Sequence, residues 1–504
     1  MNPVSSTENP MRLPSVSNRL YERLAETKSA QDRFHGMHRL ALPPLLALTL
    51  ALHLPSSPAF TAERSLVTDE PVFAKGRPEG AAEYVAKAEA ADGQHLALTM
   101  HKLQQGLDRP FLIWAIGSSY TNMLGSGEFW QRELPKRFPK TKQVEYRKMV
   151  GNSCPWQYLR GWARHLVIPD QPDLIITYTI GNPADLEKLL IELRRHTTAD
   201  IIVPSIHWRE RDIPLWGQSE NAADQDVAAV REVCRRHAVE FVENRRDWAA
   251  YLTANKLAVP ALLKDAVHQS DYGAHIINSN ILAHFRVPES LSFTPESRER
   301  LIQPEKLPDG SFTAKFTGTR LDLHGTTAPD GGTFRVLIDE KPAREANAWL
   351  MSYVQPDAKN AKEGKGANPR DQSPHGITLG QKIVPQTWTL VMTSDSGDYT
   401  LTGSVTGPDG QGNAFQPFTS PSGQILIEPD LWRRAERNRT GDRFTFEIKP
   451  AVLDEVTFTA PSATPFVLRL AQMLPNGDHT LRLVPTKPGI ATINALQVFQ
   501  PPGR

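Results

Sequence analysis

The sequence predicts an α/β protein built on a parallel sheet, followed by a β-sandwich or jelly roll. The first observation is a series of short apolar runs, at 111–116, 173–180 and 201–206, which indicate buried strands. The second is that amphipathic stretches with helical spacing follow two of these runs, at 184–195, 222–237 and 247–255. This alternation is typical of a sheet covered by helices, where the chemistry lies in loops beyond the carboxyl ends of the strands.

The pattern changes after about residue 289, where short strand-like segments replace the alternation. They are separated by turn-forming clusters at 329–332, 407–410 and 475–478. So many short strands at such spacing indicate the sandwich or jelly roll. Within this region, residues 357–374 are rich in Lys, Gly, Asn and Asp, which predicts a mobile surface loop. The expected strands are 312–316, 320–324, 333–338, 387–393, 399–406, 443–448, 455–459, 466–470, 479–484 and 491–499.

Composition limits the class of protein. With 504 residues, 39% hydrophobic and 22% charged, the chain is long enough for two or three globular domains. A formal net charge of +1 provides no basic field for a polyphosphate backbone, so we expect no nucleic-acid partner. Cys154 and Cys234 are too few for a disulfide framework and lack the paired spacing of a zinc site. One bridge between them and two separate thiols both stay open.

The N-terminal region has the pattern of a secretory signal peptide. Met37-His38-Arg39 forms a basic flank, 40–54 is apolar, and small residues follow up to Ala62. The apolar run is shorter than the ~20 residues that a spanning helix needs, and it contains Pro43 and Pro44. We therefore expect translation to start at Met37, the signal to be cleaved and the product to be secreted or periplasmic without a stable membrane span. An uncleaved anchor is the alternative.

Two short segments carry residues suited to nucleophilic catalysis. Gly117-Ser118-Ser119-Tyr120 ends the first predicted strand, where a glycine permits a sharp turn and a serine can project above the sheet. The second segment, 264–273, contains Asp265 and His268 just before a helical run at 274–285. A carboxylate three positions before an imidazole can bind one ring nitrogen and leave the other facing the serine.

Together these segments resemble the SGNH hydrolase superfamily, also called the GDSL lipase/esterase family, over residues 109–287. Four blocks occur in the family's order: 117–120 resembles Gly-Asp-Ser-Leu, 148–153 the second block, 180–183 the third, and 265–268 with Gly273 the final Asp-x-x-His block. The resemblance implies a flavodoxin-like sheet with helices on both faces. It also implies hydrolysis of ester bonds without a metal or cofactor.

By this resemblance each functional residue has a role. Ser119 is the expected nucleophile, His268 the base and Asp265 the residue that orients the histidine. The backbone N–H groups of Ser119 and Gly151 and the side-chain amide of Asn182 are the expected oxyanion hole, which stabilises charge only as it develops in the transition state.

The blocks depart from the family pattern at two positions. Ser118 and Pro183 both stand where the family has aspartate. Neither change removes an atom of the expected mechanism, but Asn152 or Ser153 could take part of the oxyanion role. A nucleophile at Ser118 is the alternative register.

The substrate is less readable from the sequence. His207, Trp208 and Arg209 follow a predicted strand whose carboxyl end faces the same cleft, so they are candidates for binding a sugar ring. The alternative is a solvated loop with one core tryptophan. Residues 312–339 resemble the opening of a galactose-binding-like jelly roll, and Trp388 and Trp432 are either a sugar platform or core.

The expected function is a secreted esterase that removes acyl groups from a carbohydrate, with acetyl as the expected acyl group. The alternatives are a lipid or lysophospholipid esterase and a non-catalytic carbohydrate-binding protein. The expected organisation is an N-terminal extension with signal peptide (1–62), a lead-in segment (63–109), an SGNH hydrolase domain (110–288), a linker (289–305) and a galactose-binding-like β-sandwich (306–504).

Overall fold

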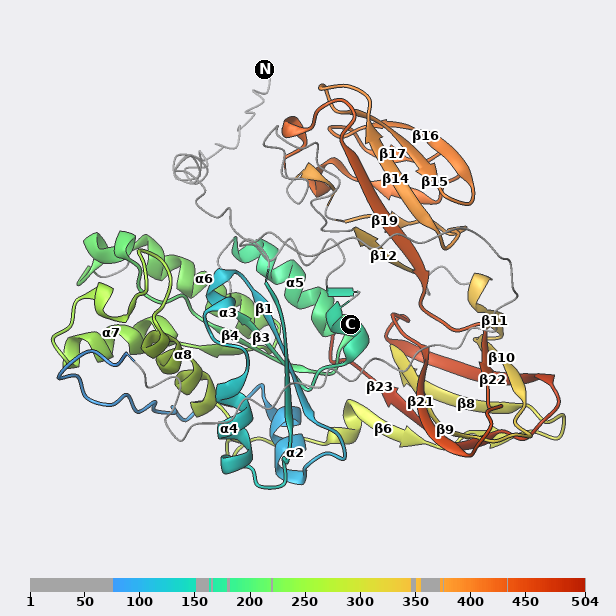
Figure 1. The fold of residues 1–504 in the computed structure, drawn as a ribbon, viewed down its shortest axis with the longest axis horizontal. Helices are drawn as coiled ribbons and strands as arrows, with labels where there is room; N and C mark the ends of the chain where they lie inside the picture. Colours follow the sequence, from blue (N-terminus) through green and yellow to red (C-terminus); the bar gives the residue numbers. More distant parts are fainter. Residues whose placement is uncertain are drawn as a thin grey trace, which may run out of the picture. The chain divides into compact units, whose positions relative to one another are not determined.

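A five-stranded parallel sheet carries the N-terminal half of the described fold (Figure 1). The computed structural model describes residues 76–150, 163–164, 166–178, 182–218, 221–345, 350–354, 372–374, 376–432 and 434–503. Strand order is β2-β1-β3-β4-β5, which is the flavodoxin-like order and confirms the predicted fold class. The strands are β1 (Phe111–Gly117), β2 (Val144–Val150), β3 (Leu174–Tyr178), β4 (Asp200–Pro204) and β5 (Glu240–Val242).

Helices cover both faces of this sheet. They are α2 (Ala97–Gln105), α3 (Ser119–Asn122), α4 (Glu128–Arg137), α5 (Pro183–His196), α6 (Ala222–Arg236), α7 (Asn244–Ala254) and α8 (Asp271–Ala283). Short 3-10 helices lie at η2 (Ile168–Asp170), η3 (Glu210–Leu215) and η4 (Val259–Leu262). The predicted helices at 184–195, 222–237, 247–255 and 274–285 all occur, shifted by a few residues at their ends.

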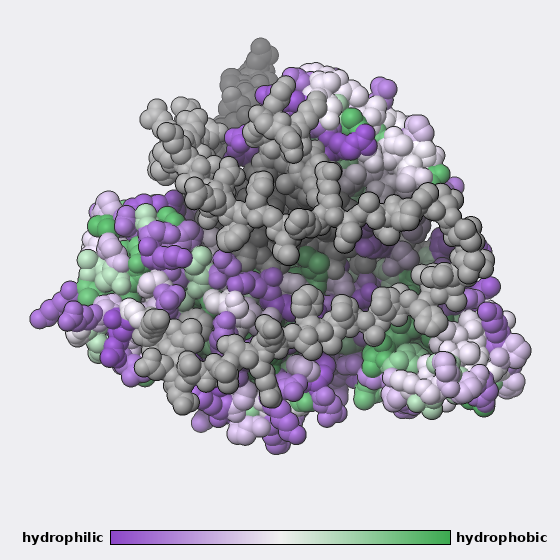
Figure 2. Space-filling model, viewed as in Figure 1, coloured by the Kyte–Doolittle hydropathy of each residue, from purple (hydrophilic) through white to green (hydrophobic). Residues whose placement is uncertain are grey.

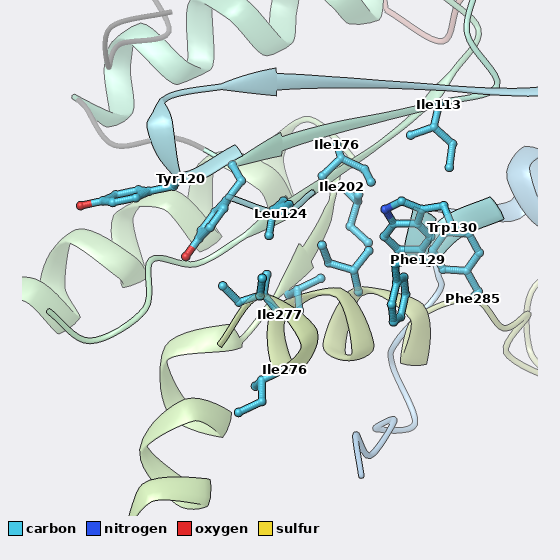
Figure 3. Close-up of a cluster of buried hydrophobic side chains, with 14 of the residues drawn as sticks. Ile113, Tyr120, Leu124, Phe129, Trp130, Ile176, Ile202, Ile276, Ile277 and Phe285 are labelled. Carbon is cyan, nitrogen blue, oxygen red and sulfur yellow. The ribbon is translucent and has the colours of Figure 1, made fainter. Parts of the chain in front are cut away.

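The two faces follow from the period-2 alternation of strand side chains. Ile113, Ile176 and Ile202 point to one face, where they pack with α2, α4, α7 and α8. Figure 3 shows Ile113, Ile176 and Ile202 on the side of the sheet that carries α8, in one cluster with Ile277 of α8 and the Phe129 and Trp130 rings of α4. The intervening residues, such as Leu112 and Ile175, face α5 and α6 instead. Because both faces are covered, the strands β1, β3 and β4 are buried throughout, as their continuous apolar runs predicted.

The helix α2 lies in the segment that we expected only to lead into the domain. Leu96, Met100 and Leu103 are buried in the same core as β1 and β3. The packed α/β unit therefore begins before residue 110.

The remainder of the described chain is antiparallel β structure with two separate apolar cores. One core lies between a sheet in the order β11-β10-β22-β8-β7, with β20 paired to β10, and a sheet in the order β21-β9-β23-β6. The other is formed by the sheets β12-β19-β14-β15-β16 and β13-β18-β17. The second set is inserted in the chain between β11 and β20. The region predicted as one sandwich thus contains two.

The strands of the first set are β6 (Glu299–Ile302), β7 (Glu305–Lys306), β8 (Phe312–Gly318), β9 (Arg320–Thr327), β10 (Thr333–Ile338), β11 (Lys341–Pro342), β20 (Glu455–Thr457), β21 (Thr464–Ala471), β22 (Gly477–Lys487) and β23 (Thr492–Phe499). Those of the inserted set are β12 (Leu350–Val354), β13 (Thr378–Leu379), β14 (Thr387–Met392), β15 (Asp398–Gly403), β16 (Gly407–Asn413), β17 (Phe418–Thr419), β18 (Ile425–Ile427) and β19 (Arg443–Pro450).

One predicted turn is wrong. Residues 407–410 form the start of β16, and the turn lies at 404–406 instead. A strand can hold Pro408 here because β16 is at the edge of its sheet, where a missing N–H breaks no bond to a further strand. Trp388 and Trp432 are both buried in this second core, so they form no exposed platform.

Several expectations fall outside the described residues. They include the signal peptide, Cys154 and nearly all of the predicted loop at 357–374. Cys234 is a buried, free thiol. None of the helices in the described part of the chain has the length and apolar character that a membrane span requires.

Candidate active site

A sharp turn at the end of β1 presents one serine and buries its neighbour. A Cβ atom on Gly117 would lie 2.2 Å from both Thr121 Oγ1 and the Tyr178 carbonyl oxygen, so only glycine fits. Ser118 is buried, and its Oγ accepts a hydrogen bond from the Tyr120 N–H (3.3 Å) as the N-cap of α3. Ser119, the next residue, is exposed. The turn therefore buries Ser118 as the cap of α3 and leaves Ser119 exposed to solvent.

The second predicted segment forms a closed loop between η4 and α8. The Lys264 N–H donates to the His268 carbonyl (2.8 Å), and the Ser270 N–H donates to the Leu262 carbonyl (2.9 Å). Inside the loop, Asp265 Oδ1 accepts from the N–H groups of both Val267 and His268, each at 2.9 Å. This local turn explains the three-residue spacing, because it holds the carboxylate beside the histidine of the same loop.

The two segments meet above the sheet. Asp265 Oδ2 lies 2.8 Å from His268 Nδ1, and His268 Nε2 lies 2.8 Å from Ser119 Oγ, although Ser119 and His268 are 149 residues apart. The structure therefore brings Ser119, His268 and Asp265 into one hydrogen-bonded chain. The side chains remain partly open to solvent, with 23% of His268 and 49% of Asp265 exposed.

The environment keeps Asp265 ionised. Partial burial acts to raise the pKa of its carboxyl, but the N–H groups of Val267 and His268 and the imidazole outweigh it and hold the pKa below the ordinary value. An anionic Asp265 accepts the Nδ1–H of His268, which leaves Nε2 with a lone pair toward Ser119. This arrangement can accept the serine proton as the hydroxyl attacks an acyl carbon.

Asn182 follows β3, the strand next to β1 at the point where the strand order reverses. It is exposed and caps α5, with its Oδ1 accepting from the Ala184 N–H at 2.9 Å. Pro183 occupies the first turn of α5, where a residue without an N–H costs nothing. The cap holds the oxygen of the Asn182 amide against α5, and the amide nitrogen remains as a donor. Gly151, Asn152 and Ser153 lie outside the described residues.

The structure does not present His207, Trp208 and Arg209 as a sugar-binding surface. Their exposed fractions are 0%, 6% and 5%. Arg209 binds Asp212 through Nε and a terminal nitrogen, both at 3.0 Å, and the Arg245 guanidinium lies 3.7 Å from the Trp208 ring centroid. The segment after β4 folds inward against the loop at 264–270, which we call the catalytic loop for its proposed role, and the polar groups of His207 and Arg209 find partners inside the protein. The three side chains are therefore packed inside the protein and are not the sugar contacts that the sequence predicted.

Sequence reasoning missed two buried residues that touch this site. Gln269, beside His268, donates from Nε2 to the Tyr120 carbonyl at 2.8 Å. Tyr178, the last residue of β3, bonds through its hydroxyl to His207 Nδ1. The position of Gln269 inside the last motif block was the available signal for the first. Nothing in the sequence pattern pointed to the second.

A separate buried cluster has metal-ligand residue types. One ligand atom from each of Asp92, Glu240 and His284 lies within 4.8 Å of the others. These atoms already have internal partners: His284 Nδ1 bonds Glu240 Oε1 (2.6 Å), which also accepts the Gly93 N–H (2.7 Å). The cluster shares no residue with the hydrogen-bonded chain of Asp265, His268 and Ser119.

Comparison with known proteins gives matches to solved structures only, since no family model and no curated protein sequence matches this chain. LAE5, an alpha/beta hydrolase enzyme from the metagenome of Lake Arreo, is 19% identical and has a TM-score of 0.29; the match covers 34% of this chain and 94% of LAE5. Axe2, an acetylxylan esterase from Geobacillus stearothermophilus, is 18% identical with a TM-score of 0.29, and the match covers 36% of this chain and 96% of Axe2. A variant of Axe2, described as an acetyl-xylooligosaccharide esterase, is 18% identical at the same TM-score over 38% and 100%.

Proposed function

We propose that this chain is a serine ester hydrolase in which Ser119 is the nucleophile, His268 the general base and Asp265 the residue that orients the imidazole. The observation that carries the proposal is the continuous chain of hydrogen bonds from Asp265 through His268 to Ser119, with 2.8 Å at each junction. It lies beyond the carboxyl ends of β1 and β3, where ligands bind in sheets of this order.

The geometry supports acyl transfer in two steps. His268 Nε2 takes the proton from Ser119 Oγ as the oxygen attacks the ester carbon, and then returns it to the departing alcohol. A water molecule activated by the same imidazole hydrolyses the acyl-serine and releases the acid. The negative charge on the former carbonyl oxygen would be met by the N–H of Ser119, the side-chain amide of Asn182 and, by the family resemblance, the N–H of Gly151. Removal of one such donor typically costs about 3–4 kcal/mol of transition-state stabilisation.

We propose that the acyl group is small, with acetyl as the first candidate, and that the alcohol belongs to a carbohydrate. Trp216, on the segment after β4, is 38% exposed and packs edge to face on Trp208 at a centroid distance of 4.7 Å. The same segment bonds the catalytic loop through the Glu210 N–H and the Ala266 carbonyl (3.0 Å). A flat, half-exposed ring in that place suits stacking against a sugar. In the view of Figure 2 the described surface mixes hydrophilic residues with hydrophobic ones.

We also propose that the protein acts outside the cytoplasm, secreted or periplasmic. The support is the sequence of residues 37–62, with its basic flank, apolar run and small residues.

The nucleophile is tested with Ser119→Ala and p-nitrophenyl acetate. We expect kcat to fall by a factor of about 10⁴ or more, because removal of a triad member leaves only binding and the oxyanion donors. Since Ser119 is exposed, the unfolding temperature should stay the same. An active Ser119→Ala variant would reject the proposed function.

The substrate class is tested by acyl chain length and by the alcohol. Turnover of p-nitrophenyl esters from acetate to decanoate should be highest for acetate, and an acetylated polysaccharide should release acetate with wild type but not with Ser119→Ala. Activity confined to long acyl chains or to a lysophospholipid would replace the carbohydrate proposal with a lipid esterase.

A further inference from the structure

Two buried side chains hold the residues on either side of His268. The Val267 carbonyl oxygen accepts a hydrogen bond from His207 Nε2 at 2.9 Å. On the other side, Gln269 Nε2 donates to the carbonyl of Tyr120, the residue after Ser119, at 2.8 Å. His207 and Gln269 are 0% and 1% exposed. The imidazole of His268 is thus attached at both neighbours to the framework that carries Ser119.

The proton positions on His207 follow from its partners. A carbonyl oxygen only accepts, so His207 Nε2 carries the hydrogen and Nδ1 accepts from the Tyr178 hydroxyl. Burial lowers the pKa of His207 to about 3, although the Val267 carbonyl acts to raise it. His207 is therefore neutral at ordinary pH, and it provides a permanent donor to the loop rather than an acid or base.

The ring of His207 is also fixed by packing. Its centroid lies 5.0 Å from that of Tyr120 and 5.1 Å from that of Trp248. Behind it, Arg245 bonds Asp212 (3.1 Å) and so secures the segment after β4. The donor to Val267 consequently has little freedom to move.

We propose that His207 and Gln269 are positioning residues that set the distance between the His268 imidazole and Ser119 Oγ. The inference rests on the proposed function, since it assigns these two residues a part in the same proton transfer. Neither side chain is exposed to a substrate. Their effect acts through the loop, where a displacement of about 1 Å can cost 10²-fold in rate.

The test compares His207→Phe, which keeps a ring but loses the donor, with His207→Gln, whose amide nitrogen can still donate to Val267. We expect kcat for p-nitrophenyl acetate to fall by about 10- to 100-fold in His207→Phe, with KM within about threefold, and His207→Gln to recover most of the loss. Gln269→Met, close in shape and without the donor, should lower kcat in the same way.

The matched control is His284→Phe. His284 is another buried histidine, and its Nδ1 bonds Glu240 at 2.6 Å. We expect this variant to lose stability but to retain the wild-type kcat per folded molecule. Unfolding temperatures of all variants separate loss of fold from loss of rate. If His207→Phe does not fold, Tyr178→Phe and Gln269→Met carry the test.

A readout without turnover separates this inference from the proposed function. The ¹⁵N shifts of the His268 ring, assigned with a His268→Ala variant, should change in His207→Phe and Gln269→Met and return in His207→Gln. Wild-type kcat and unchanged ring shifts in His207→Phe and Gln269→Met would overturn the positioning role. Full activity of Ser119→Ala would instead overturn the proposed function, while the ring shifts would still report whether the loop is held.

Discussion

Two polar clusters lie at opposite ends of the parallel sheet, and each is built around an aspartate that serves a different purpose. At the amino end of β3, Asp173 is fully buried and accepts bonds from Lys102 Nζ (2.8 Å), the Arg109 guanidinium (2.6 and 2.8 Å) and the Leu112 N–H (2.8 Å). Beyond the carboxyl ends, Asp265 is half exposed and binds its own loop and His268. Both are carboxylates held by donors.

The difference lies in what remains available. The acceptor sites of Asp173 are occupied by fixed cations and a backbone N–H, so the group can only contribute to structure. The chain from Asp265 ends instead at Ser119 Oγ, which is exposed. In the proposed function, Asp265 takes part in the reaction because its chain of hydrogen bonds ends at the exposed residue Ser119, which a substrate can reach.

Of the two carboxylates, Asp265 has the larger expected effect on activity, tested with Asp265→Asn. An amide at this position cannot hold the imidazole in the tautomer that leaves Nε2 free to accept a proton, so kcat should fall by about 10³- to 10⁴-fold with little change in stability. Steady-state kinetics with p-nitrophenyl acetate and thermal unfolding check both parts. A large loss of stability with normal kcat would show that Asp265 has a structural role, like Asp173.

Asp173→Asn should produce the reverse pattern. It leaves Lys102 buried without its full counter-charge, and breaking such a buried pair costs about 3–5 kcal/mol. We expect a marked fall in the urea midpoint and unchanged kcat per folded molecule. A lower kcat with an unchanged urea midpoint would contradict the purely structural role of Asp173.

Acid should remove this difference in stability. Burial acts to raise the pKa of Asp173, but Lys102 and Arg109 outweigh it and hold the pKa below its ordinary value. A depressed folded pKa means that the stabilisation is complete above the unfolded pKa of about 3.9 and is lost as pH falls through the folded pKa. Urea midpoints of wild type and Asp173→Asn should therefore differ by a constant amount from pH 7 to 5 and approach each other below about pH 4. A gap that shrinks already near pH 6 would contradict the assigned cause.

The smallest effect is expected for Ser118→Ala, one residue from the nucleophile. Loss of its N-cap bond should cost about 0.5–1 kcal/mol, and kcat should stay within about tenfold. Paired with Ser119→Ala, this variant tests whether burial divides the two serines into a structural and a reactive one. A loss of activity as large as that of Ser119→Ala would favour the alternative register.

The sequence allowed the α/β core to be predicted because its central strands are buried on both faces. The runs at 111–116, 173–180 and 201–206 are continuous and apolar, and they became β1, β3 and β4. The edge strands β2 and β5 were missed, since three charged residues interrupt Val144–Val150 and Glu240–Val242 has three residues. Such segments acquire strand geometry from their neighbours rather than from their own composition.

The candidate site was predictable where chemistry depends on local spacing. Asp265 and His268 belong to one loop. Ser119 lies two residues after Gly117, whose tight turn has no room for a side chain. His207 shows the limit of such reasoning. Its position after β4 suggested a cleft residue, whereas packing turned the segment inward and buried the ring.

The sequence by itself determined the order of elements, the apolar faces of the sheet and the short motifs, because these depend on neighbours within a few positions. Only the tertiary structure decided which serine faces His268 and that cations and a backbone N–H occupy the acceptor sites of Asp173. It also decided that His207 bonds Val267 and that Gln269 bonds Tyr120. These contacts join residues 60 or more positions apart, and their existence depends on how helices and loops pack over the sheet.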